Sequence, residues 1–198
     1  MLEGLITKMR IISGKARGTK LYTLEGMATR PTLDRVKEAL FSILQNQMRD
    51  ADVLDLFAGS GALGLEALSR GAKKAWLCDA SAKAIAIIEK NSIKTHAMDR
   101  VCIVKKDFQK CLEQFHDQKL QFDIIFLDPP YDTDYIYEAV KQIMQYGLLK
   151  KNGSIIAETD QEERVLQQLQ STHILIKDVR KFGRVKLLFL EIELWNEP

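Results

Sequence analysis

The amino-acid sequence predicts a doubly wound α/β fold with a mostly parallel sheet. From residue 52 onward, short apolar runs alternate with longer segments in which apolar residues recur at helical spacing. A glycine-rich turn follows the first of these runs, and the last run alternates apolar with polar residues. Strands that alternate with crossover helices form parallel sheets that helices cover on both faces.

The expected strands and helices follow this alternation. We expect strands at residues 53–57, 75–79, 101–105, 122–127 and 154–158. We expect helices at residues 63–69, 81–95, 108–116 and 135–146, and the buried stripe of the second helix to consist of Ala84, Ile87, Ile88 and Ile93. Residues 172–177 and 186–194 are typical of a hairpin-like pair, which would add an antiparallel strand to the sheet.

Residues 1–50 differ from the rest and predict a small N-terminal extension. Residues 10–13 and 19–22 flank a basic, glycine-bounded segment, residues 14–18, which is typical of a β-hairpin. A helix follows, with Thr32 as its N-cap and a buried face formed by Val36, Leu40, Ile43 and Leu44. We therefore divide the chain into a hairpin and helix extension, residues 1–50, and a catalytic α/β domain, residues 51–198.

Charge is distributed unevenly between these two parts. Residues 1–50 carry nine Lys or Arg against five Asp or Glu, a net charge of +4, whereas the whole chain of 198 residues has a net charge of +2. A basic segment on a near-neutral body indicates a partner that carries phosphates. The alternative is that these basic residues form an ordinary solvated surface with no specific partner.

Composition excludes several other classes of protein. The three cysteines and three histidines show no spacing typical of a metal site, so we expect no metal and a reducing, cytoplasmic location. No run approaches the roughly 18 apolar residues of a membrane span. Met9 directly precedes the first predicted strand, which leaves open whether Met1 or Met9 is the start.

The glycine-rich turn predicts an adenosine cofactor. Gly59, Gly61 and Gly64 match the pattern G-x-G-x-x-G, and Asp79 stands twenty residues after Gly59 at a predicted strand end. A carboxylate there can accept hydrogen bonds from two ribose hydroxyls. This pattern alone does not separate a nicotinamide enzyme from a methyltransferase.

Two further acids favour S-adenosylmethionine. Asp55, inside the first strand, would repel a pyrophosphate but attract the ammonium of a methionine moiety. Asp107 and Phe108 follow the third strand, where they could bind and stack on adenine. The alternative is that Asp79 and Asp107 only cap the following helices. We predict that the cofactor contacts Asp55, Phe57, Ala58, Gly59, Gly61, Asp79, Ala80, Asp107 and Phe108.

The segment Asp128-Pro129-Pro130-Tyr131 follows the fourth strand, at the end where α/β sheets bind ligands. Two prolines make a rigid turn that presents carbonyl groups. Asp128 and the carbonyl beside Pro129 could accept hydrogen bonds from both N–H groups of a planar amine, while Tyr131 stacks on its ring. We therefore predict these four residues as catalytic; an ordinary strand-ending turn is the alternative.

These motifs, together with Arg10-Ile11-Ile12-Ser13-Gly14, Arg30-Pro31-Thr32 and residues 34–41, resemble the RsmD family. The resemblance covers the chain from Arg10 onward, although Asp79 stands where the family often has glutamate. It implies a Rossmann-like class I methyltransferase with a seven-stranded sheet, converting S-adenosylmethionine to S-adenosylhomocysteine. It also implies methylation of the exocyclic N2 amine of one guanine in bacterial 16S ribosomal RNA, in the small subunit or its assembly intermediate.

On this interpretation the basic residues of the extension bind RNA phosphates without reading its sequence. The candidates are Arg10, Lys15, Arg17, Lys20, Arg30 and Arg35. We expect a monomer. The sequence leaves open an amino-methyltransferase for adenine in DNA or another planar amine, a nicotinamide-dependent oxidoreductase, and a non-catalytic RNA-binding protein; it does not define which nucleotide is modified.

Overall fold

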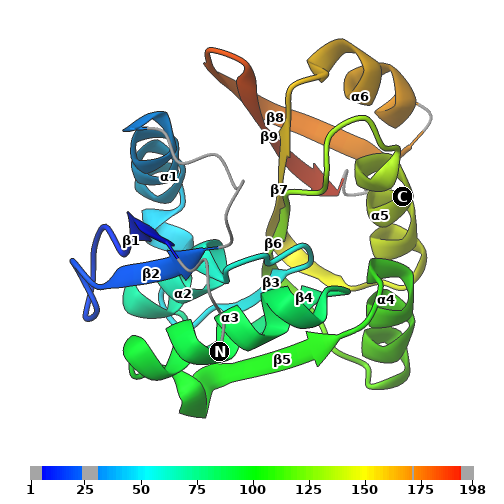
Figure 1. The fold of residues 1–198 in the computed structure, drawn as a ribbon. Coiled ribbons are helices and arrows are strands. Elements are labelled where there is room, and N and C mark those ends of the chain that lie inside the picture. Colours follow the sequence, from blue (N-terminus) through cyan, green and yellow to red (C-terminus); the bar gives the residue numbers. More distant parts are fainter. Residues whose placement is uncertain (1–5, 24–30, 171, 193–198) are drawn as a thin grey trace.

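The computed structural model describes residues 6–23, 31–170 and 172–192 (Figure 1). Its strands are β1 (Ile6–Arg10), β2 (Lys20–Thr23), β3 (Asp52–Asp55), β4 (Lys74–Asp79), β5 (Val101–Lys105), β6 (Phe122–Leu127), β7 (Leu149–Thr159), β8 (Ile174–Phe182) and β9 (Val185–Ile192). Its α-helices are α1 (Pro31–Ile43), α2 (Ala62–Ser69), α3 (Ala82–Lys94), α4 (Phe108–Asp117), α5 (Tyr135–Gln145) and α6 (Glu162–Leu169).

The main sheet has seven strands in the order β5-β4-β3-β6-β7-β9-β8. Strands β3 to β7 pair in parallel, whereas β9 pairs antiparallel with both β7 and β8. The predicted doubly wound sheet and its antiparallel addition are confirmed. The chain moves outward from β3 to β5 and then returns to β6, so the strand order reverses between β3 and β6. Ligands of open α/β sheets bind at such a switch point.

The four predicted helices of the sheet domain are confirmed to within one or two residues. Strand β3 ends at Asp55, two residues earlier than predicted, because Leu56 and Phe57 already belong to the turn. Strand β7 begins at Leu149, five residues before the predicted start. Helix α6 was not predicted, because only Val165 and Leu169 of its residues are buried and the apolar pattern is therefore weak.

Two isoleucines predicted to be buried are exposed. Ile93 on α3 is 63% exposed, since it lies on the face opposite Ala84, and the polar Asn91 and Ser92 occupy the buried positions instead. Ile43 at the end of α1 is 41% exposed, because the buried face of that helix turns toward residues 37, 41 and 44.

The predicted hairpin is present, but its first strand lies earlier in the chain than expected. Strand β1 ends at Arg10, where the prediction began, and β1 and β2 pair antiparallel. The predicted N-cap of the next helix is wrong, because Thr32 lies inside α1, whose first residue is Pro31. Proline suits a first helical turn, where its missing N–H would have no partner. The end of the last predicted strand, residues 193 and 194, lies outside the described residues.

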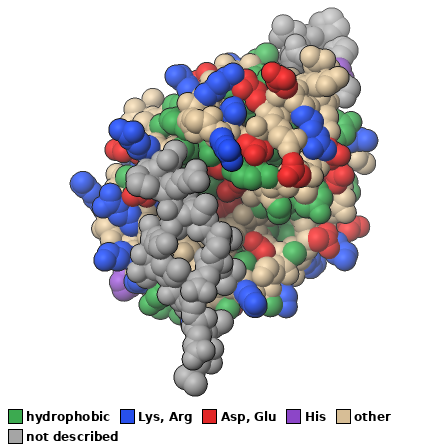
Figure 2. Space-filling model, turned by 45° about the horizontal axis from the view of Figure 1, so that its top comes forward, with side chains coloured by type: hydrophobic (Ala, Val, Ile, Leu, Met, Phe, Trp, Pro, Cys, Tyr) green, Lys and Arg blue, Asp and Glu red, His purple; other side chains and the backbone are tan. Residues whose placement is uncertain are grey.

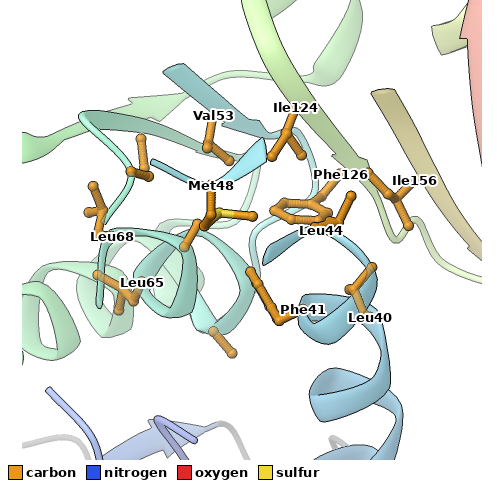
Figure 3. Close-up of a cluster of buried hydrophobic side chains, with 14 of the residues drawn as sticks. Leu40, Phe41, Leu44, Met48, Val53, Leu65, Leu68, Ile124, Phe126 and Ile156 are labelled. Atoms are coloured by element: carbon orange, nitrogen blue, oxygen red, sulfur yellow. The ribbon is translucent and has the colours of Figure 1, made fainter. Parts of the chain in front are cut away.

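Two hydrophobic clusters fill the two faces of the sheet. Helices α1, α2 and α3 cover one face, and α4, α5 and α6 cover the other (Figure 1). Alternate residues along β6 point to opposite clusters, Phe126 to the first and Ile125 to the second. In the first cluster, Phe41 and Met48 pack with residues of the sheet (Figure 3). The described residues of the N-terminal extension therefore share a hydrophobic core with the sheet.

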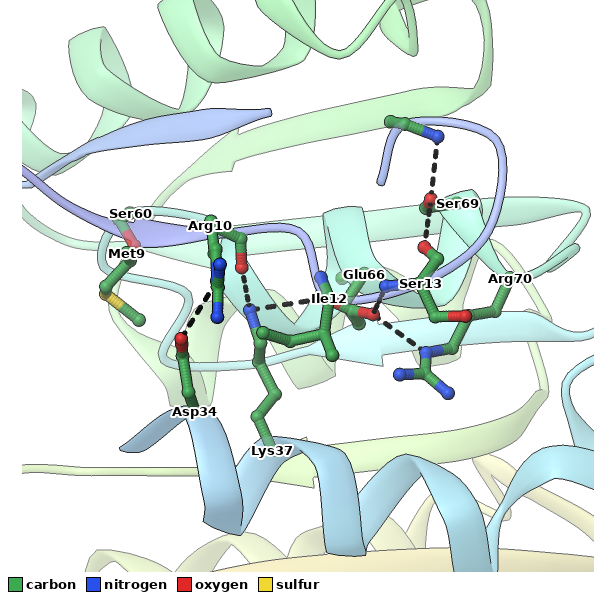
Figure 4. Close-up of polar contacts among 12 residues, drawn as sticks. Met9, Arg10, Ile12, Ser13, Asp34, Lys37, Ser60, Glu66, Ser69 and Arg70 are labelled. Carbon is green, nitrogen blue, oxygen red and sulfur yellow. Dashed lines mark hydrogen bonds and ion pairs between the residues drawn. The ribbon is translucent and has the colours of Figure 1, made fainter. Parts of the chain in front are cut away.

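A buried carboxylate, Glu66 of α2, connects the extension to the sheet domain (Figure 4). It accepts hydrogen bonds from the backbone N–H groups of Ile12 at 2.8 Å and Ser13 at 3.0 Å. It also pairs with Lys37 of α1 at 3.2 Å and with Arg70 at 2.8 Å. Burial lowers the pKa of Lys37, and the charge of Glu66 opposes that shift. This network holds the loop after β1, helix α1 and helix α2 together.

Two more polar contacts fix the hairpin. The Lys15 N–H donates to the Ser69 carbonyl at 2.8 Å, and a side chain at Gly14 would place its Cβ 1.9 Å from that same oxygen. On the other side, the side-chain amide of Asn91 accepts from the Tyr22 N–H at 2.8 Å and donates to the Ser60 carbonyl at 2.9 Å. Asn91 thus ties β2 to the glycine-rich turn.

Replacing Glu66 with alanine should destabilise the protein by about 3–5 kcal/mol, because Lys37 would become an unpaired buried charge. Urea unfolding followed by circular dichroism measures the change in the free energy of unfolding. Glu163 is exposed on α6 and supplies the matched control, Glu163→Ala, with an expected effect within about 0.5 kcal/mol. Equal effects of the two substitutions would show that the Glu66 network does not stabilise the fold.

Candidate active site

A cavity of about 830 Å³ opens at the carboxyl ends of the parallel strands. Its volume lies in the range of roughly 300–1,000 Å³ typical of small-molecule sites. Figure 2 shows a hollow on this face with acidic side chains beside it and Lys and Arg side chains on the surrounding surface. Residues from β3, β4, β6 and β7 or the turns after them reach the cavity, as expected at a switch point.

Almost all of the predicted catalytic and cofactor-binding residues line this one cavity. The four predicted catalytic residues do so, and so do the predicted cofactor residues Asp55, Phe57, Ala58, Gly59, Asp79, Ala80, Asp107 and Phe108. Gly61 is not among the lining residues. It has a φ of +78° and stands immediately before α2, so its conformational freedom serves the turn into that helix.

Asp55 is buried at the end of β3, with 1% of its surface exposed. Its Oδ2 accepts a hydrogen bond from the Gly64 N–H at 3.1 Å. Burial raises the pKa of Asp55 to about 7; the Gly64 hydrogen bond opposes this shift and the Asp79 charge adds to it. A buried carboxylate of this kind is stabilised in its charged form by a cation, which is the property expected of an ammonium-binding group.

The acids after β4 and β5 have different structural roles. Asp79 accepts from the Gly59 N–H at 2.9 Å and the Ser81 N–H at 2.8 Å, so it holds the glycine-rich turn. It does not cap α3, because Ser81 is the N-cap of that helix. Asp107 does cap α4, accepting from the Lys110 N–H at 3.0 Å. Both carboxylates also line the cavity, so for Asp107 capping and ligand binding are compatible.

Three aromatic rings form one wall of the cavity. Phe57 and Phe108 lie 5.4 Å apart between ring centroids, and Tyr135 lies 5.0 Å from Phe108. Phe57 and Tyr135 are stacked with an interplanar angle of 5° at 6.1 Å. Rings in such a group offer faces on which a planar heterocycle can pack. The contribution of Tyr135 was not predicted, because no motif distinguishes it from other helix-start residues.

The predicted catalytic turn follows β6 directly. The Thr133 hydroxyl donates to the Pro130 carbonyl at 2.9 Å and so braces the turn. Asp128 exposes its surface to the cavity, but the surrounding protein displaces water from the carboxyl group. This desolvation, with the neighbouring charges of Glu158 and Asp55, holds the pKa of Asp128 well above its ordinary value. Desolvation also raises the pKa of Tyr131.

Glu158 is a lining residue that sequence reasoning missed. It lies near the end of β7, and its Oε1 accepts a hydrogen bond from the Tyr131 hydroxyl at 3.3 Å. Desolvation raises the pKa of Glu158, and the Tyr131 hydrogen bond opposes that shift. The available signal was its position, since it is an acid at the end of the strand that follows the catalytic turn. Lys37 and Met9 of the N-terminal extension also reach the cavity.

The predicted RNA-binding residues lie on the surface of the extension. Arg10, Lys15, Arg17, Lys20 and Arg35 are exposed. The Arg10 Nε pairs with Asp34 at 3.1 Å. Arg30 lies outside the described residues.

In the described part of the chain, no group of three or more His, Cys, Asp or Glu residues could hold a metal ion. Cys78, Cys102 and Cys111 are free thiols. No helix among the described segments has the length and apolar character needed to cross a membrane.

Comparison with known proteins identifies the family to which the chain belongs. Residues 9–191 match the family described as Conserved hypothetical protein 95. Ribosomal RNA small subunit methyltransferase D of Haemophilus influenzae is 36% identical over 161 residues, which cover 80% of this chain and 82% of that protein. The chain belongs to the RsmD family.

Other comparisons agree with membership of the RsmD family. Bacillus subtilis YlbH is 37% identical over 154 residues, covering 78% of this chain and 84% of YlbH. The solved structure of Escherichia coli yhhF has a TM-score of 0.78 at 29% identity and covers 94% of this chain and 98% of that chain. The resemblance seen in the motifs is therefore confirmed, as is the Rossmann-like fold that it implied.

Titration of Asp55 should make the unliganded protein less stable as the pH rises. Its raised pKa of about 7 means that the folded protein keeps a proton that the unfolded chain has released. This contribution to stability is fully present below about pH 4 and is lost as the pH rises through about 7.

Asp55→Asn tests this titration, because an asparagine still accepts from the Gly64 N–H but cannot ionise. The free energy of unfolding of the wild type minus that of the variant should fall by on the order of 4 kcal/mol between pH 4 and pH 8. Denaturant unfolding at each pH gives this difference. A difference that stays constant over the range would exclude the raised pKa.

Proposed function

We propose that this chain transfers a methyl group from S-adenosylmethionine to the exocyclic N2 amine of a guanine in 16S ribosomal RNA of the small subunit. The observation that supports it most is the opening of Asp128-Pro129-Pro130-Tyr131 and Asp55 into the same cavity. Membership of a family that includes a small-subunit methyltransferase favours ribosomal RNA as the substrate.

The residues around the cavity suit S-adenosylmethionine, which supplies an activated methyl group when bound. Asp55 would bind its ammonium group, since a buried carboxylate with a raised pKa gains from a cation. Asp79 keeps lone pairs for ribose hydroxyls beside its two backbone contacts. Asp107 and Phe108 would bind the adenine, with Phe57 in the same aromatic wall. The other proposed cofactor contacts are Ala58, Gly59 and Ala80. Gly61 would contribute indirectly, because its positive φ allows the turn into α2.

Asp128 and the carbonyl beside Pro129 would act on the amine of the target base. The lone pair of such an amine is delocalised into the ring, which makes it a poor nucleophile. Acceptors for both N–H groups favour a pyramidal nitrogen and stabilise the positive charge that develops there. Pro130 braces the turn, and Tyr131 would stack on the base and orient it.

The target guanine must leave its stack to reach the cavity. Arg10, Lys15, Arg17, Lys20, Arg30 and Arg35 would hold the surrounding RNA by its phosphates. We infer that the chain acts as a monomer in the cytoplasm, on the small subunit or an assembly intermediate.

The alternative activity with most support is methylation of another planar amine, such as adenine in DNA, because the catalytic turn suits any of them. Nicotinamide chemistry is disfavoured, since Asp55 would repel a pyrophosphate. A non-catalytic RNA-binding role is disfavoured by the intact catalytic turn.

Incubation with labelled S-adenosylmethionine and small subunits from a strain that lacks the enzyme tests the proposed function. We expect label on the N2 amine of one guanine of 16S ribosomal RNA, located by nuclease mapping and mass spectrometry. Asp128→Ala should lower kcat by about 100-fold or more while leaving cofactor affinity unchanged, whereas Asp128→Asn, which keeps an acceptor, should lose less. Label on adenine, DNA or protein, or near-normal turnover of Asp128→Ala, would contradict the proposal.

Replacing Arg17 and Lys20 with alanine should weaken binding of the RNA substrate but not of the cofactor. Loss of two phosphate contacts should reduce the slope of log affinity against log salt by about 1 to 2. Filter binding at several salt concentrations measures the slope, and calorimetry measures cofactor affinity. Lys119 and Lys151 are exposed near the opposite ends of the strands, so Lys119→Ala with Lys151→Ala is the matched control. RNA affinity equal to that of the control would refute the assignment.

A further inference from the structure

Glu158 is a carboxylate of the cavity that has no part in the reaction described above. Strands β6 and β7 pair with Leu127 opposite Ala157, so the same register brings Asp128 and Glu158 side by side at the strand ends. Paired residues of parallel strands point to the same face of a sheet. Both carboxylates line the cavity, and the Tyr131 hydroxyl donates to Glu158 at 3.3 Å.

Two neighbouring carboxylates favour a ligand that offers hydrogen-bond donors or positive charge. Desolvation raises the pKa of each, and the charge of Glu158 raises that of Asp128 further. Asp55 is a third carboxyl group near Asp128 and raises its pKa further, and Asp160 likewise raises the pKa of Tyr131. Asp55, Asp128 and Glu158 therefore bring three carboxyl groups to one cavity, where their oxygens can accept hydrogen bonds from a ligand. A group that brings several N–H donors, or a developing positive charge, would be stabilised there.

We propose that Glu158 selects guanine by accepting a hydrogen bond from N1–H of the target base while Asp128 accepts from its 2-amine. This inference rests on the function proposed above. The Watson–Crick edge of guanine presents N1–H and the 2-amine as adjacent donors, which match two adjacent acceptors. Adenine presents the lone pair of N1 beside its amine, so a carboxylate would face a lone pair. The two carboxylates together accept guanine and reject adenine.

A purely structural role for Glu158 makes a different prediction. If its carboxylate only held the Tyr131 hydroxyl, removing the hydrogen bond from either partner would have the same effect. Tyr131→Phe removes that hydroxyl and keeps the aromatic ring, leaving the Glu158 carboxylate in the cavity. Base selection in this variant therefore separates the two roles.

The base 2-aminopurine provides the test, because it keeps the 2-amine but carries a lone pair at N1. Small subunits are reconstituted with 16S ribosomal RNA that contains guanine or 2-aminopurine at the mapped position, and kcat/KM is measured for each. The wild type should prefer guanine by roughly 10- to 100-fold. Glu158→Gln, whose amide can donate to N1, should reduce this preference by about tenfold or more. Tyr131→Phe and the surface control Glu163→Gln should keep the wild-type preference.

Each outcome has a distinct meaning. A wild type that methylates both bases equally, or an unchanged preference in Glu158→Gln, would overturn selection by Glu158 while leaving guanine methylation in place. Equal changes in Glu158→Gln and Tyr131→Phe would show a structural role and also overturn it. A wild type that methylates no guanine would instead refute the proposed function. Circular dichroism checks folding, and Glu158→Ala, which removes the carboxylate altogether, replaces Glu158→Gln if that variant does not fold.

Discussion

The buried carboxylate of Glu66 is the contact on which the placement of the N-terminal extension depends. It is the common acceptor for two backbone N–H groups of the loop after β1 and for the charges of Lys37 and Arg70. An ionised group inside a protein is costly without such partners, so Lys37 and Glu66 stabilise each other. Because Lys37 also lines the cavity, the same network connects the basic extension to the site.

Much of the sheet domain and most of the site could be predicted from the sequence. Apolar runs of strand length mark β4 to β6, because parallel strands are buried on both faces. The acids Asp55, Asp79 and Asp107 could be assigned to one site because parallel strands end at one edge of the sheet. The periodicity of α3 and α4 is equally clear, and their bounds agree closely with those expected.

The residues that could not be predicted are polar groups whose partners lie far along the chain. Glu66 and Asn91 are fully buried, although their residue types are usually exposed, and each accepts a hydrogen bond from a backbone N–H group more than 50 residues away, Ser13 for Glu66 and Tyr22 for Asn91. Asn91 in turn leaves Ile93 on the solvent face of α3. Glu158 belongs to no motif, and only the register between β6 and β7 brings it to Asp128. These contacts join residues that are far apart in the chain, so the local sequence pattern does not predict them.

The antiparallel strand β9 has a consequence for how the protein is made. It covers the edge of β7 along Ile155 to Thr159, yet it is synthesised well after β7. Until β9 leaves the ribosome, β7 presents an open, apolar edge of the kind that joins other chains. Glu158 pairs with Leu187 of β9 on that edge, so the strand that carries this cavity residue has neighbours on both sides only after β9 has been made. Newly made chains that stall before β9 would therefore be prone to aggregate.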